Sequence, residues 1–189
     1  MRDTTVMRSS VMIGLRHDVD NTYGLRKGLP KIISIEEGYG VKSTFFVRAD
    51  IIRSDKDRNL IRQIANKGWE IGLHLANTTG ISEMPSPEEE LETLKKLGFQ
   101  IHGVTPCGKT IGFKGEVTWR IMDSLGLKYM EGHGTPTFPV NTFVMSTHLS
   151  FDIYYIKKFG EEEGYRKFKE DLLDRLENDG LATVLIHPE

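Results

Sequence analysis

Residues 11–20 read Val-Met-Ile-Gly-Leu-Arg-His-Asp-Val-Asp, and the architecture can be worked out from this stretch. Its first part, residues 11–16, is a short and mostly apolar run of the kind that forms a buried strand. In an extended chain Asp18 and Asp20 project to the same side, because side chains alternate along a strand. The stretch therefore predicts a buried strand whose carboxyl end carries two acids.

Short apolar runs and amphipathic runs alternate through the rest of the chain. Further strands are predicted at 43–48, 69–73, 101–105, 127–131, 142–146 and 182–186. Helices are predicted at 24–37, 57–67, 87–97, 115–125 and 161–179. Strands that alternate with helices lie parallel, and the helices pack outside the sheet. The pattern predicts one α/β domain over residues 1–189, either an open doubly wound sheet or a barrel one unit short of the (β/α)8 type.

Composition narrows the class of protein. The chain has 25 Lys and Arg against 27 Asp and Glu, for a formal net charge of −2. This balance predicts neither a nucleic-acid partner nor a membrane surface. Cys107 is the only cysteine, so no intrachain disulfide and no Cys-rich zinc module can form. No apolar run approaches the ~18 residues that span a bilayer, and residues 1–5 lack the apolar character of a signal peptide, so a cytoplasmic protein is expected.

Histidines concentrate at the ends of the predicted strands. Five of the six lie there: His17, His74, His133, His148 and His187. Parallel strands bring their carboxyl ends to one face, where chemistry is normally found in such folds. The carboxylates of Asp18 and Asp20 would repel each other unless a cation lay between them. One acid could therefore bind a metal while the other acts as a base. Alternation turns His17 to the opposite side, behind this site.

Five short motifs occur in order along the chain. They are Arg-His-Asp-Val-Asp at 16–20, Lys-Ser-Thr-Phe-Phe-Val at 42–47, Gly-Trp-Glu-Ile-Gly-Leu-His at 68–74, Thr-Pro-Cys-Gly at 105–108 and Leu-Ile-His-Pro at 185–188. As an ordered set they resemble the motifs of the polysaccharide deacetylase superfamily (the NodB-homology domain, carbohydrate esterase family 4), of which the chain looks like a divergent member. The resemblance implies a distorted (β/α)7 barrel related to the TIM barrel. It also implies a divalent metal, zinc first with cobalt, manganese or nickel as alternatives, and hydrolysis of N-acetyl or other amide groups.

The resemblance also assigns roles to single residues. Asp18 matches the catalytic base, Asp20 and His74 match two metal ligands, and His187 matches the histidine that protonates the leaving amine. Two residues of the 105–108 motif match positions that line the substrate groove: Pro106 and Gly108.

The chain departs from the family pattern at two positions. Thr78 stands where a second metal-binding histidine is expected, and Val104 replaces an arginine that orients the base. Threonine oxygen is a poor zinc ligand, so the missing ligand would have to come from elsewhere on the same rim. The sequence leaves three candidates open for that ligand: His133, His148 and His17. It leaves two for the missing positive charge: Arg16 and Arg48.

These observations support two functions of different classes. The first is a metal-dependent amidohydrolase that deacetylates an N-acetylated sugar or a small amide, and the retained base, acid and metal ligands favour it. The second is a non-catalytic barrel that binds a carbohydrate or another small ligand, which the two departures favour. The irregular stretch 132–141 is expected to form a loop that shapes specificity. An edge of the barrel is expected to be either open or covered by a second copy of the chain.

Overall fold

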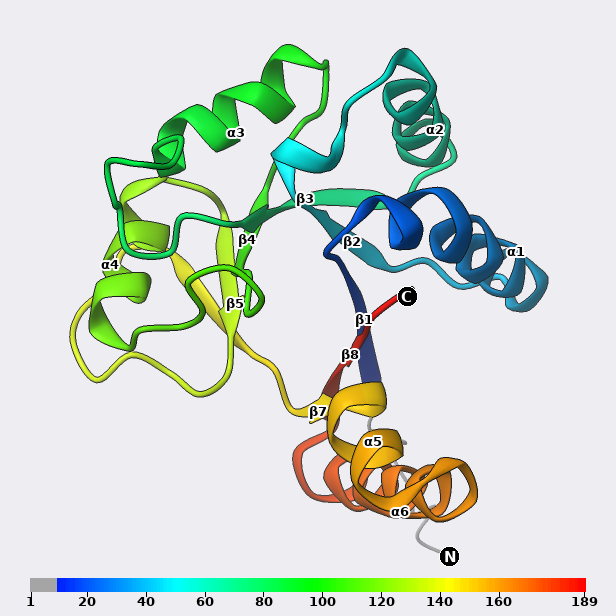
Figure 1. Ribbon diagram of the computed structural model, residues 1–189. Coiled ribbons are helices and arrows are strands. Elements are labelled where there is room, and N and C mark those ends of the chain that lie inside the picture. Colours follow the sequence, from blue (N-terminus) through cyan, green and yellow to red (C-terminus); the bar gives the residue numbers. More distant parts are fainter. Residues whose placement is uncertain (1–9) are drawn as a thin grey trace, which may run out of the picture.

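The computed structural model describes residues 10–189 (Figure 1). Residues 1–5, on which the expectation of no signal peptide rests, lie outside this range. In this part of the chain eight strands form one sheet: β1 (Met12–Val19), β2 (Thr44–Val47), β3 (Glu70–Leu75), β4 (Gly103–Pro106), β5 (Tyr129–Gly132), β6 (Phe143–Ser146), β7 (Leu149–Ser150) and β8 (Leu181–Ile186). Their order is β6-β5-β4-β3-β2-β1-β8-β7, and every pair is parallel.

The two edge strands are consecutive pieces of one segment. Only Thr147 and His148 separate β6, which pairs with β5, from β7, which pairs with β8. The chain thus passes from one edge of the curled sheet to the other. This confirms the distorted (β/α) barrel and its seven strand positions, of which β6 and β7 share one. The second piece was not predicted, because two residues are too short to show a strand period.

All five predicted helices are present outside the sheet (Figure 1): α1 (Leu29–Tyr39), α2 (Asp55–Asn66), α3 (Pro87–Lys96), α4 (Glu116–Ser124) and α6 (Glu161–Asp179). Ser54 and Ser86 begin α2 and α3 with capping boxes, which satisfy the free N–H groups of the first turn. Four short elements were not predicted separately: π-helical η1 (Gly24–Gly28), 3-10 helix η2 (Ala49–Ile51), π-helical η3 (Phe151–Ile156) and α5 (Lys157–Phe159). Within residues 10–189, no helix combines the length and apolarity that crossing a membrane requires.

The core fixes the orientation of the first strand. Phe45 of β2 is fully buried and stacks on the His17 ring, with 4.9 Å between the ring centroids. His17 also shares a 2.9 Å hydrogen bond with Glu36 of α1. His17 therefore packs between the sheet and α1, behind the strand, as the alternation predicted. The same alternation turns its neighbour Asp18 to the barrel interior.

Candidate active site

Asp18 has one oxygen held and one oxygen free. It lies in β1, opposite Phe46 of β2, and it is buried. Arg16 Nη2 donates a hydrogen bond to Asp18 Oδ2 at 2.9 Å. Asp18 Oδ1 is buried and has no hydrogen-bond partner among the described residues. A carboxylate with one fixed and one uncommitted oxygen is arranged to accept a proton from a water or a ligand.

Arg16 is the cation that accompanies Asp18. Its Nη1 donates to Thr147 Oγ1 at 2.9 Å and lies 3.3 Å from Glu131 Oε1. Burial raises the pKa of Glu131, and the Arg16 charge offsets this only in part. Arg48, the other sequence candidate, pairs instead with Asp50 at 2.7 Å. One buried guanidinium thus bridges two carboxylates that come from opposite sides of the barrel.

Asp20, His74 and Cys107 form a compact and fully buried group. His74 Nε2 lies 2.9 Å from Asp20 Oδ1, and the Cys107 thiol donates to the same oxygen at 3.3 Å. One ligand atom from each of the three residues lies within 4.8 Å of the other two. The register of β3 and β4 brings His74 and Cys107 together. His74 pairs with Thr105 of β4, and Cys107 follows Thr105 by two residues. The backbone N–H of Cys107 donates to Leu75 O at 2.8 Å.

The electrostatics of this group reflect its close packing. Burial alone would raise the pKa of Asp20, but hydrogen bonds from His74, Lys109 and Cys107 outweigh it and hold the pKa well below its usual range. Burial alone would lower the pKa of His74, but the Asp18 charge and the hydrogen bond to Asp20 raise it to about 10. The group therefore favours an ionised Asp20 beside a positive charge.

The donor set fits a zinc-like metal. Carboxylate oxygen, imidazole nitrogen and thiolate sulfur are the ligands that catalytic zinc takes, three from the protein with an open fourth position. The uncommitted Asp18 Oδ1 nearby is a further sign that the site accepts a cation or a polar ligand. Cys107 was not predicted as a ligand, because a single cysteine by itself only excludes a disulfide and a Cys-rich zinc module. Its place directly after a strand and inside the 105–108 motif was the available signal for a ligand.

Among the described residues, none of the three candidates for the missing ligand, His133, His148 and His17, belongs to the group of Asp20, His74 and Cys107. His17 instead bonds Glu36 behind β1. Thr78 is buried, and its hydroxyl donates to Gly112 O at 2.6 Å. His133 is exposed at the rim after β5, where desolvation and the Arg16 charge lower its pKa. His148 Nδ1 accepts from the Thr183 backbone N–H at 3.1 Å, outside the site.

His187 enters the site from the end of β8. Its Nε2 lies 3.8 Å from Asp20 Oδ2, and its Nδ1 lies 2.9 Å from Asp152 Oδ2. Burial alone would lower the pKa of His187, but the hydrogen bond and charge of Asp152 raise it. Asp152 was missed by sequence analysis because it belongs to η3, a short element with no periodic signal.

The groove positions of the 105–108 motif lie next to the same group. Pro106 ends β4 opposite Leu75. Gly108 is exposed, and a Cβ added there would meet no other described residue within 4 Å. Directly after them, Lys109 Nζ lies 3.0 Å from Asp20 Oδ2. The loop after β4 thus contributes both a thiol and a cation to the site.

No protein-family model and no curated protein matches the sequence. Solved structures do match. A polysaccharide deacetylase described as putative, from Mycobacterium smegmatis, superposes with a TM-score of 0.68 at 16% identity, over 93% of this chain and 76% of that one. The chain has the fold of the polysaccharide deacetylases. Puue allantoinase is similar to it at a TM-score of 0.67 and 16% identity, over 93% and 77% of the two chains. A CE4-family pseudoenzyme from Bacillus anthracis superposes with a TM-score of 0.56 at 17% identity, over 95% of this chain and 55% of that one.

Proposed function

We propose that this protein is a metal-dependent hydrolase of a C–N bond that removes the acyl group from an N-acetylated sugar or small amide. One observation carries the proposal: the three candidate metal ligands lie beside a carboxylate with a free oxygen and a histidine held by an acid. A bound divalent cation would supply a Lewis acid that polarises the amide carbonyl and makes water more acidic.

The chain's own residues would carry the proton transfers. Asp18 Oδ1 is free to take a proton from the attacking water, while Arg16 keeps Oδ2 in place. His187 would give a proton to the departing nitrogen, and Asp152 favours the protonated form of that ring. Asp20, His74 and Cys107 would hold the metal. A base and a proton donor beside one set of candidate metal ligands suit the hydrolysis of an amide.

A second candidate is a non-catalytic barrel that binds a carbohydrate or small ligand. Thr78 in place of the expected histidine favours it, as does the likeness to a pseudoenzyme of carbohydrate esterase family 4. We favour the hydrolase, because Cys107 would supply a third ligand in place of that histidine. A binding site has no need of a base and a proton donor in addition to metal ligands.

Metal content and hydrolysis test the proposal together. Protein purified without chelator is expected to hold about one divalent metal per chain, which Asp20→Ala and His74→Ala should each remove. The metal-loaded protein would then be assayed on N-acetylated amino sugars and small acetylated amines by amine release. Asp18→Asn should keep the metal and abolish release. Binding of a sugar without release, in protein that lacks metal, would favour the second candidate.

A further inference from the structure

Lys109 lies in the candidate active site, although no motif marks it. Its ammonium nitrogen is 3.0 Å from Asp20 Oδ2, the oxygen that His187 Nε2 approaches to 3.8 Å. The other oxygen of Asp20 faces His74 and Cys107. The lysine head group is therefore on the His187 side of Asp20, and the other two candidate ligands are at the opposite oxygen.

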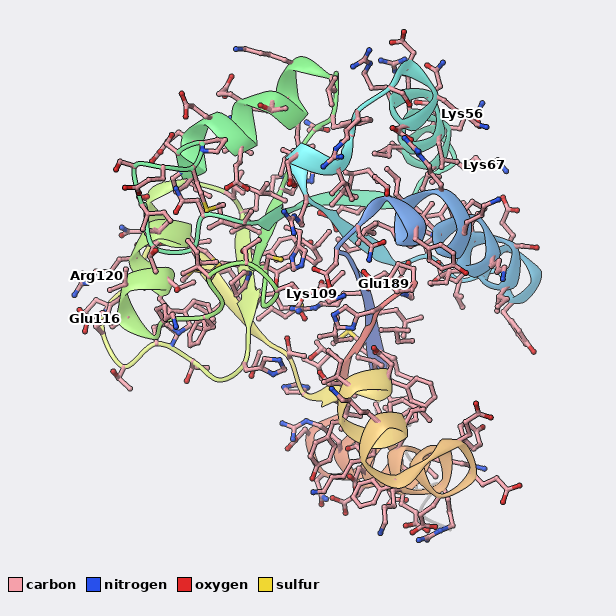
Figure 2. The ribbon with its side chains drawn as sticks, in the orientation of Figure 1. Lys56, Lys67, Lys109, Glu116, Arg120 and Glu189 are labelled. Carbon is pink, nitrogen blue, oxygen red and sulfur yellow. The ribbon has the colours of Figure 1, made fainter. Side chains whose placement is uncertain are left out.

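Glu189 holds the Lys109 head group from a second direction. The ammonium donates to Glu189 Oε2, and the two labelled side chains meet in Figure 2. η1 leaves little space around this segment: a Cβ at Gly24 would lie 3.3 Å from Glu189 Cγ, and one at Gly28 would overlap the Pro188 carbonyl oxygen. Two carboxylates thus fix the position of a cation whose side chain is otherwise half exposed.

The loop that carries Lys109 is attached to the segment after β3. The Thr110 hydroxyl donates to Ala76 O at 2.7 Å, and the Thr78 hydroxyl donates to Gly112 O at 2.6 Å. Thr78 occupies the position where the family pattern has a metal-binding histidine. In this chain that position supports the lysine loop instead of supplying a ligand.

Lys109 also has a hydrogen-bond donor to spare. Hydrolysis of an amide needs donors at the carbonyl oxygen, where negative charge develops. The backbone N–H of Cys107 is already used by Leu75 O. A lysine ammonium has three N–H donors, and Asp20 and Glu189 take two of those on Lys109. The third N–H has no partner among residues 10–189 and is available to a substrate.

We propose that Lys109 is a catalytic residue that donates a hydrogen bond to the carbonyl oxygen of the scissile amide and stabilises the oxyanion formed there. This inference rests on the hydrolase function proposed above. The water oxygen bonds to the carbonyl carbon, its proton passes to Asp18, and the carbonyl π pair moves onto the oxygen beside Lys109. That pair then reforms the carbonyl as the C–N bond breaks, and the nitrogen takes a proton from His187. Lys109 keeps all of its protons, and the products are a carboxylic acid and an amine.

The positions of Lys109 and His187 suit the two ends of one amide. Both side chains approach the same oxygen of Asp20. The oxygen and nitrogen of an amide are bonded to a single carbon, so the groups that act on them must be neighbours. A lysine that only balanced the charge of Asp20 would have no need of a second anchor at Glu189.

A role limited to charge balance gives a different experimental result. Removing the ammonium would then free Asp20, raise the affinity for metal, and leave turnover per bound metal unchanged. A catalytic role instead lowers turnover per bound metal. The two roles are separated by measuring the rate and the metal content on the same samples.

The primary test uses the zinc-loaded protein and 4-nitrophenyl acetate, with kcat normalised to bound zinc. This ester passes through the same oxyanion, but its leaving group needs no proton, so the assay separates Lys109 from His187. Lys109→Met is expected to lower kcat per zinc by roughly 10²-fold, and Lys109→Arg should recover part of the loss. Lys56→Met removes an exposed charge far from Lys109 and should match the wild type (Figure 2).

A binding measurement provides a readout that does not need turnover. Titration of the zinc-loaded protein with acetohydroxamic acid, followed by calorimetry, should show at least tenfold weaker binding for Lys109→Met. Equal kcat per zinc and equal affinity in the wild type and Lys109→Met would overturn the inference and leave the proposed function standing. A wild type that binds no zinc, or that neither cleaves the ester nor binds the hydroxamate, would contradict the proposed function and this inference with it.

Discussion

Asp152 holds His187 by two hydrogen bonds, one from the backbone N–H at 3.1 Å and one with ring Nδ1 at 2.9 Å. This pairing turns Nε2 toward Asp20. Because Nδ1 is engaged with a carboxylate, Nε2 is the nitrogen that can give a proton to a substrate. Asp152 is contributed by η3, which directly follows β7 at the point where the sheet edges are joined.

Replacing Asp152 should therefore weaken proton donation. Asp152→Asn removes the charge that raises the pKa of His187, so a smaller fraction of the ring is protonated at neutral pH. Amide hydrolysis is expected to fall by roughly 10²-fold, while cleavage of 4-nitrophenyl acetate changes little. Steady-state kinetics on both substrates would check this. Equal losses on the ester and the amide would mean that Asp152 supports the fold of the site and not the proton transfer.

Cys107 is expected to be a metal ligand. Cobalt bound to a thiolate shows sulfur-to-metal charge-transfer absorption, which the cobalt-loaded wild type should display and Cys107→Ala should lack. Cys107→Ala should also weaken zinc binding, measured by competition with a chromogenic chelator. Asp55→Asn is a suitable control, because that exposed carboxylate pairs only with Arg58 of α2 among the described residues and lies outside the ligand group. A wild-type cobalt spectrum without a sulfur band would exclude the thiolate as a ligand.

Arg16 should be the most stability-sensitive residue of the site. Arg16→Met leaves two buried carboxylates, Asp18 and Glu131, without their cation. Removing one partner of a buried ion pair typically costs about 3–5 kcal/mol of unfolding free energy. Urea denaturation would measure the loss, and Arg16→Met combined with Glu131→Gln should recover part of it. A double variant no more stable than Arg16→Met would show that Glu131 does not depend on the guanidinium.

Gly28 is required by its contact with the segment after β8. A Cβ at this position would lie 1.4 Å from the Pro188 carbonyl oxygen, so Gly28→Ala must displace Pro188 and, with it, the neighbouring His187. We expect lower amide hydrolysis and a lower melting temperature. Gly38→Ala is the matched control, since within the described part of the chain no residue outside its own helix turn lies within 4 Å of its Cβ position in α1. That change should stabilise the helix by roughly 0.5–1 kcal/mol. Full activity in Gly28→Ala would contradict the prediction.

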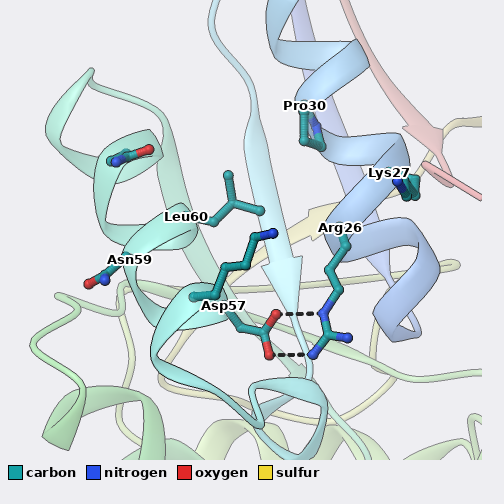
Figure 3. Close-up of a pocket in the computed structure, with 8 residues that line it drawn as sticks. Arg26, Lys27, Pro30, Asp57, Asn59 and Leu60 are labelled. Atoms are coloured by element: carbon teal, nitrogen blue, oxygen red, sulfur yellow. Dashed lines mark hydrogen bonds and ion pairs between the residues drawn. The ribbon is translucent and has the colours of Figure 1, made fainter.

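Asp57 should make stability depend on acid pH. Its buried carboxylate accepts two hydrogen bonds from Arg26, at 2.7 and 2.8 Å (Figure 3). It also accepts hydrogen bonds from Ser54 in the capping box of α2. These bonds lower the pKa of Asp57 below its usual range. The stabilisation is therefore present above the unfolded-state pKa of about 3.9 and is lost as pH falls further. Asp57→Asn should reduce the unfolding free energy at pH 7 more than at pH 3, measured by urea denaturation at both values.

The sequence by itself determined the order of strands and helices and the side of the barrel on which Asp18, Asp20 and His74 lie. These features depend on local periodicity, because alternation along β1 sets the direction of each acid and the short apolar runs mark the strand ends. The seven strand positions follow from the same signal. The resemblance to the deacetylase motifs supplied the roles that we propose for these residues.

Only the tertiary structure decided which other groups complete the site. Cys107 reaches Asp20 across 87 residues of chain, and Arg16 bonds Thr147 across 131. Asp152 and Lys109 depend on the path of an irregular element and a loop, which no sequence period describes. These groups come together because of the register of neighbouring strands and because the sheet curls until its two edges approach each other. These are properties of packing between distant segments, and local side-chain patterns carry no information about them.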